Sequence, residues 1–158
     1  MKIESVVTIK KELQHLSHAE LMALCLRLAR FKKENKALLT YLLFKAHDED
    51  DYVASVKELL DSDFENMNTN SYFYMKKTIR KILRQIKTYA RYSNSKTTEI
   101  ELLLYFCERL NGLKPNIHRN QTLKNLYARQ KLAIAKKVAV LHEDLQYDYT
   151  VQLEELRD

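Results

Sequence analysis

The sequence has almost no glycine or proline and contains no tryptophan. Among its 158 residues there is one glycine, Gly112, and one proline, Pro115. Turns in strand-rich folds depend on these two residue types, and both break helices, so their scarcity favours an all-α protein. A single glycine also excludes the glycine-rich loops with which P-loop and dinucleotide-binding proteins hold phosphates. The composition therefore predicts an all-helical fold and removes whole classes of nucleotide-dependent enzymes.

Cysteine and long hydrophobic runs are also scarce. The two cysteines, Cys25 and Cys107, each lie inside a helical apolar pattern, which predicts buried free thiols in a reducing compartment. No apolar run approaches the length of about 18 residues that a membrane span needs. Residues 1–11 lack the apolar core and the cleavage site of a secretory signal. We therefore expect one cytoplasmic helical domain over residues 1–158, with no membrane partner.

One stretch, residues 72–92, combines an apolar and a cationic pattern. Its apolar residues step by four and three positions and fall within about 40° of one line on a helix. They are Met75, Ile79, Ile82, Ile86 and Tyr89. Its basic residues fall on the opposite arc, and no acid lies between Glu65 and Glu99. We therefore predict one helix over residues 72–92, with one face in the core and the other purely cationic.

The formal net charge of +6 is distributed in blocks of alternating sign. The segment 47–69 carries −7, the segment 70–96 carries +8, and the tail 143–158 carries −5. Two interpretations follow for the basic block. In the first, the acidic helix lies antiparallel beside the basic one and the two compensate each other. In the second, the basic arc is free and contacts a phosphate backbone.

Capping signals predict the helices before this stretch. Ser17-x-x-Glu20 is a capping box that opens a helix over residues 18–32. Asn35 is expected to cap the next helix. A further helix over residues 50–66 follows a run of acids, which complement the positive end of a helix dipole.

Similar signals predict the helices after it. Thr98-x-x-Glu101 offers a second capping box, and Asn111-Gly112 predicts a left-handed helix end. Helices over residues 121–141 and 143–156 complete a total of seven to eight antiparallel helices. The whole chain is therefore expected to consist of short helices joined by short breaks.

An internal repeat is faintly visible. Residues 21–31 match residues 82–92 at a constant offset of 61, and both segments end in Ala-Arg-aromatic. This match predicts two three-helix repeats, 18–66 and 72–141, stacked as a short α-solenoid. The alternative is an irregular bundle, because any two amphipathic helix pairs align about as well. The chain resembles uncharacterised small all-helical proteins of bacterial type and, loosely, helical-repeat scaffolds, a resemblance that rests on no specific motif and implies no activity.

Candidate catalytic and metal-binding groups have simpler structural interpretations. The acids at residues 48–51 stand at a helix start, where carboxylates are normally solvated and favoured by the dipole. His15 and His18 are three positions apart but straddle a predicted break, and no spacing matches a metal-binding motif. We therefore predict no catalytic residue, no metal site and no cofactor, and the sequence favours a non-enzymatic protein.

The sequence favours a helical protein–protein interaction module or scaffold that binds an unknown protein or a second copy of itself. The alternative is nucleic-acid binding through the basic face of the helix 72–92. The residues expected to contact phosphates are Lys77, Arg80, Lys81, Arg84, Lys87 and Arg91. Tyr72, Tyr74 and Tyr92 at the helix ends are expected to stack on bases.

Overall fold

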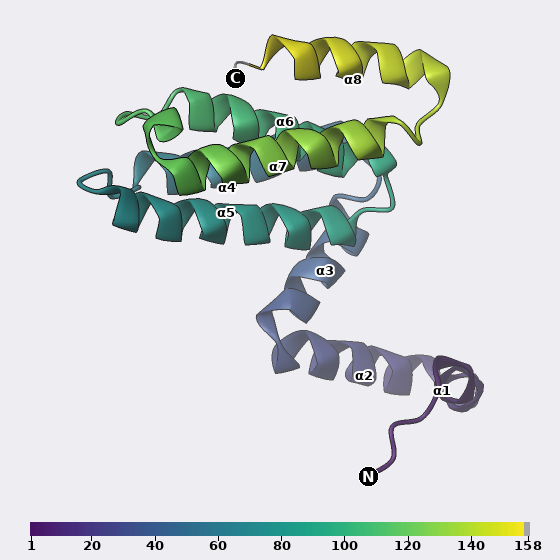
Figure 1. Cartoon of the computed structure of the whole chain (residues 1–158). Coiled ribbons are helices and arrows are strands. Elements are labelled where there is room, and N and C mark those ends of the chain that lie inside the picture. The colour runs from purple at the N-terminus through teal and green to yellow at the C-terminus, as the bar shows by residue number, and fades with distance from the viewer. Residues whose placement is uncertain (157–158) are drawn as a thin grey trace. The chain divides into compact units, whose positions relative to one another are not determined.

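The computed structural model describes residues 1–156 and divides the chain into two compact units, Met1–Phe44 (unit 1) and Lys45–Asp158 (unit 2). The described residues form eight α-helices and one short 3-10 helix, with no strand among them, so the all-α prediction is confirmed (Figure 1). No helix within the described part of the chain has both the length and the apolar character needed to cross a membrane. One domain over residues 1–158 stays a prediction.

Unit 1 contains three helices, α1 (Val6–Leu13), α2 (His18–Phe31) and α3 (Lys33–Phe44). The last two follow each other directly in the chain, meet at an angle and contact each other (Figure 1). The predicted capping box opens α2: the Glu20 N–H donates to Ser17 Oγ at 3.2 Å, and the Ser17 N–H donates to Glu20 Oε2 at 2.7 Å. This reciprocal pair satisfies two backbone donors that a helix start otherwise leaves to water.

The predicted cap at Asn35 is wrong. Helix α3 begins two residues earlier, at Lys33, and Asn35 lies inside its first turns. The Asn35 side-chain amide instead donates to the carbonyl oxygen of Leu28 at 2.8 Å. That carbonyl is one of the last four in α2, which have no intrahelical partner. The asparagine therefore ties the end of one helix to the start of the next.

Unit 2 contains five α-helices and η1, which are α4 (Glu49–Glu65), α5 (Tyr72–Tyr92), α6 (Lys96–Asn111), η1 (Ile117–Arg119), α7 (Gln121–Val138) and α8 (Glu143–Glu155). Helix α6 is central, because it packs against α4, α5, α7 and α8 (Figure 1). Eight of its 16 residues are buried. A helix packed on several sides needs apolar residues around most of its circumference, which is what the α6 sequence supplies.

The predicted capping box at Thr98 is also wrong. Helix α6 begins at Lys96, and Thr98 is only 1% exposed. Its hydroxyl donates to the carboxylate of Glu49, which also accepts from the Ser93 hydroxyl. The threonine therefore joins the start of α6 to the start of α4, a tertiary contact that competes with a local cap.

The helix end at Gly112 is right-handed rather than left-handed, with φ of −82°. Its N–H still donates to helical carbonyls, to Arg109 at 3.2 Å and to Glu108 at 3.3 Å. Because Gly112 keeps the right-handed helical conformation, the helix end does not need the positive φ that favours glycine.

The boundary between the units falls inside the first predicted repeat, 18–66. Helices α2 and α3 belong to unit 1, whereas α4 packs on α5 and α6 in unit 2. The internal repeat stays a prediction.

Candidate functional site

Helix α5 spans Tyr72–Tyr92 without a break, as the sequence predicts. Ser71 caps its start, with the Tyr74 N–H donating to Ser71 Oγ at 3.4 Å. Its core side is closed, because four residues of the predicted apolar line are 0% exposed, namely Met75, Ile79, Ile82 and Ile86. Tyr89, the fifth, is half-buried at the edge, and Ala90 is buried beside it.

The six predicted phosphate-binding residues are all exposed on the other side of α5. They are Lys77, Arg80, Lys81, Arg84, Lys87 and Arg91. One helix without an acidic residue positions them, so their spacing is set by the rise and turn of α5 alone. The structure therefore brings together every residue that the sequence assigns to this surface.

The acidic helix α4 compensates little of this charge. Lys81 Nζ lies 2.8 Å from Asp63 Oδ1 on α4. Within residues 1–156, no ion pair involves the other five candidates, Lys77, Arg80, Arg84, Lys87 and Arg91. Another α4 acid, Asp61, pairs with Arg109 at 3.2 Å and accepts a hydrogen bond from the Tyr105 hydroxyl, both on α6. Of these two α4 carboxylates, only that of Asp63 pairs with a basic residue of α5, and that of Asp61 contacts α6.

The tyrosines expected to stack on bases have mostly structural contacts. The Tyr72 hydroxyl donates to the Asn116 carbonyl oxygen at 2.8 Å, and the Tyr92 ring makes an edge contact with Tyr89 at 6.0 Å between centroids. Tyr74 is 47% exposed but lies on the side of the helix away from most of the basic residues.

Sequence reasoning missed Phe73. Its side chain is 71% exposed, and with four basic residues it lines an open surface hollow of about 480 Å³. The four are Lys76, Lys77, Arg80 and Arg84. Their spacing of three, four, seven and eleven positions from Phe73 is the helical signal that could have identified it.

A second candidate surface lies in unit 1. Fifteen of the 23 exposed large apolar residues of the described chain belong to this unit. They are Met1, Ile3, Val6, Val7, Ile9, Leu13, Met22, Leu24, Leu26, Leu28, Phe31, Leu38, Leu42, Leu43 and Phe44. In contrast, Tyr41 is the one buried residue of unit 1. We call these fifteen residues the apolar surface of unit 1.

Part of this surface is hollowed. A groove of about 250 Å³ is lined by apolar side chains of α1 and α2 and the segment between them, including Ile9, Leu13 and Leu24. Two acidic residues, Glu4 and Glu12, also line the groove. A groove lined largely by apolar side chains can accept apolar side chains of another helix.

Cys25 lies on α2 and is exposed, which corrects the prediction of a buried thiol. The other half of that prediction is confirmed, because Cys107 is buried and 0% exposed. Burial raises the pKa of the Cys107 thiol to about 12, so it stays protonated and inert at neutral pH. The helical pattern around Cys25 is apolar, but within unit 1 nothing covers that side of α2.

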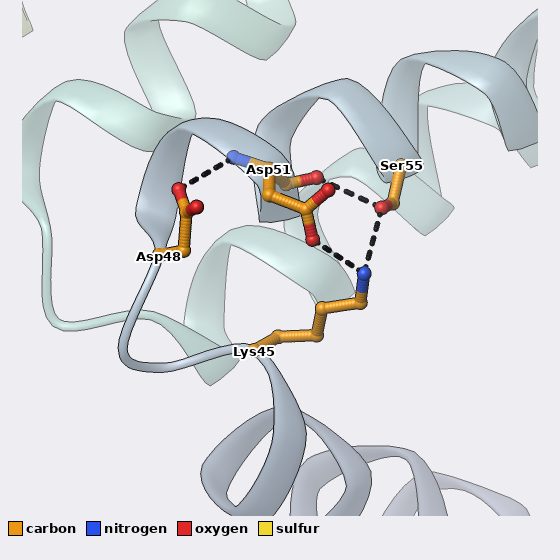
Figure 2. A network of polar contacts seen from close by, with 4 residues as sticks. All are labelled: Lys45, Asp48, Asp51 and Ser55. Atoms are coloured by element: carbon orange, nitrogen blue, oxygen red, sulfur yellow. Dashed lines mark hydrogen bonds and ion pairs between the residues drawn. The ribbon is translucent and has the colours of Figure 1, made fainter.

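The acids at residues 48–51 act in local structure. Asp48 caps α4 by accepting the Asp51 N–H at 3.0 Å, and Lys45 Nζ lies 2.5 Å from the Asp51 carboxylate (Figure 2). The same ammonium group donates to Ser55 Oγ at 3.1 Å. Within residues 1–156, no group of three or more His, Cys, Asp and Glu side chains is placed to hold a metal ion.

Another hollow, of about 250 Å³, lies among α4, α6 and α8. Its polar groups contact each other: Tyr149 donates to Glu101 Oε1 at 2.8 Å, and Lys57 Nζ lies 5.2 Å from the centre of the Tyr105 ring. Burial, and then the hydrogen bond to Glu101, raises the pKa of Tyr149 to about 12. The tyrosine therefore remains a donor that holds α8 against α6.

No family of proteins, no curated protein sequence and no solved structure matches this chain.

Proposed function

We propose that this chain is a helical protein–protein interaction module whose unit 1 binds another protein through its apolar surface. The observation that carries the proposal is the concentration of fifteen exposed large apolar residues within Met1–Phe44. Monomeric proteins rarely leave contiguous apolar patches larger than a few hundred Å² in water. Each buried Å² of such surface contributes about 25 cal/mol to association, before the costs of binding are subtracted.

The size and charge of unit 1 support the same function. A stable interface uses about 800 Å² and some 20 to 30 residues on each side, a size that a three-helix unit can supply. Unit 1, Met1–Phe44, is only slightly longer than the length of about 40 residues below which a domain usually needs oligomerisation or a covalent staple to remain folded. Unit 1 carries eight basic and four acidic residues, which favours a partner with an acidic surface.

Site-specific photo-crosslinking in cells tests this function. A photoreactive phenylalanine analogue replaces Phe31, which is 76% exposed on α2, or Tyr147, which is 73% exposed on α8 and serves as the matched control. We expect a covalent adduct to one defined protein, or to a second copy of the chain, from position 31 alone. Equal or absent adducts at the two positions contradict the proposal.

A second candidate function is nucleic-acid binding by α5. It is supported by the exposed basic face, on which five of the six candidate residues have no ion pair within residues 1–156. Cations without a protein partner are available to phosphates, whose neutralisation releases counterions and strengthens binding at low salt. From Lys77 to Arg91 the face extends about 21 Å at 1.5 Å per residue, enough to meet several phosphates.

Fluorescence anisotropy with labelled DNA and RNA tests this second function. We expect affinity that falls steeply with salt concentration and is abolished by joint charge reversal, Arg80→Glu, Arg84→Glu and Lys87→Glu. Undiminished binding by the triple variant excludes α5 as the binding surface.

A further inference from the structure

Seven side chains of α5 form one stripe along the helix. Counted at 100° per residue, they fall within an arc about 100° wide that begins about 100° from the centre of the buried line. They are Phe73, Lys76, Lys77, Arg80, Arg84, Lys87 and Arg91. Lys81 lies outside this arc and pairs with Asp63 on α4. This α5 stripe therefore consists of one aromatic ring followed by six cations.

The aromatic ring at the start of the stripe is open to solvent. Phe73 is 71% exposed, and its ring contact with Tyr74 is edge-on, with 5.5 Å between centroids and 78° between planes. The ring borders the hollow of about 480 Å³ that four cations of the stripe also line. An exposed aromatic ring costs free energy in water, and this one lies where cationic groups gather.

We propose that the α5 stripe binds single-stranded nucleic acid, with a base stacked on Phe73 and the backbone following the basic residues toward Arg91. The inference rests on the second function proposed above and adds the ligand class and the stacking residue. In a duplex the base faces are covered by neighbouring bases, so only a single strand offers a face to an isolated ring. From Phe73 to Arg91 the stripe is about 27 Å long, which spans several nucleotides.

The two parts of the stripe have separable effects. Stacking involves no charge, so Phe73 contributes to affinity at every salt concentration. Each phosphate contact of a lysine or arginine releases a counterion and adds about 0.7 to the slope of log affinity against log salt for a single strand. Affinity and salt slope therefore report on the ring and on the cations independently.

The test measures binding of the full chain to a labelled oligothymidylate and to a duplex of matched length, across a series of salt concentrations. We expect tighter binding to the single strand. Phe73→Ala should weaken that binding about fivefold or more with an unchanged salt slope, and Phe73→Trp should retain it. Arg80→Gln with Arg84→Gln should lower the slope by about 1.4. Tyr147→Ala, which removes an equally exposed ring on α8, should change neither quantity.

The outcomes separate the inference from the function it rests on. Equal affinity for single strand and duplex, with no effect of Phe73→Ala but a lower slope in the arginine variant, overturns the stacking site and leaves phosphate binding in place. No binding to either probe by the wild-type chain removes both. Circular dichroism of each variant checks the helical fold, which an exposed substitution should not disturb.

Discussion

Lys81 Nζ lies 2.8 Å from Asp63 Oδ1, and this contact joins the acidic helix α4 to the basic helix α5. Compensation between these two helices is one of the two interpretations that the charge blocks of the sequence allow. In the structure, the other exposed basic residues of α5 have no carboxylate within ion-pair distance among residues 1–156. Ion pairs among the described residues therefore leave most of the α5 charge uncompensated.

The first prediction concerns this ion pair. The Lys81 and Asp63 side chains are 55% and 24% exposed, so water screens their attraction. We expect Asp63→Asn to lower the free energy of unfolding by less than about 1 kcal/mol. Urea unfolding monitored by circular dichroism measures the change. A loss several times larger would mean that α4 and α5 depend on charge compensation after all.

The second prediction concerns the buried side of α5. Ile82 is 0% exposed, and its truncation leaves a cavity that the surrounding side chains cannot fill completely. We expect Ile82→Ala to lower the free energy of unfolding by about 2–5 kcal/mol. Lys87→Ala on the exposed face of the same helix is the control and should change it by no more than about 0.5 kcal/mol. Similar values for the two variants would contradict the assigned faces.

Regular periodicity made α5 predictable, whereas isolated capping signals were less reliable. The steps from Met75 to Ile86 define one side of a helix whatever surrounds it. A hydroxyl such as that of Thr98 has several competing partners, and Glu49, distant in the sequence, binds it in the fold. Of the two predicted capping boxes, only that of Ser17 and Glu20 forms.

Burial in unit 1 could not be predicted for a different reason. The pattern around Cys25 shows that α2 is apolar on most sides, but a pattern does not specify which surface covers those sides. A helix covered by a neighbouring helix of the same unit and a helix covered by another protein have the same apolar sequence pattern. In the structure no helix of unit 1 covers Cys25, which is exposed.

The third prediction uses this difference between the two cysteines. A maleimide reagent at neutral pH should modify Cys25 in the folded protein, because its thiol is accessible. Cys107 should react only after unfolding, since burial both blocks access and raises the pKa of its thiol to about 12. Mass spectrometry of labelled peptides with and without urea measures both sites. Rapid native labelling at Cys107 would contradict the closed core around α6.

The fourth prediction concerns stability at high pH. Burial and the hydrogen bond to Glu101 raise the pKa of Tyr149 to about 12, from 10. Folded Tyr149 therefore holds its proton more tightly than the unfolded chain does. The contribution of this pKa shift to the free energy of unfolding is complete below pH 10 and is lost as the pH rises from 10 toward 12.

Urea unfolding at a series of alkaline pH values checks this. The free energy of unfolding should fall across that window for the wild type and fall less steeply for Tyr149→Phe. Tyr147→Phe, at an exposed position of the same helix, is the control and should keep the wild-type slope. Identical slopes for all three proteins would exclude Tyr149 as a source of the pH dependence.

The central claim is that the apolar surface of unit 1 is built to be covered by another protein. Without its partner, the purified chain should cover this surface by self-association, because contiguous apolar patches associate in water. Sedimentation equilibrium over a range of concentrations tests this most directly, for the wild type and for a variant with Leu28→Glu and Phe31→Glu, two exposed positions of α2. We predict a mass above 18.8 kDa that rises with concentration for the wild type, and the monomer mass for the variant. A wild-type chain that remains at 18.8 kDa at every concentration would contradict the account.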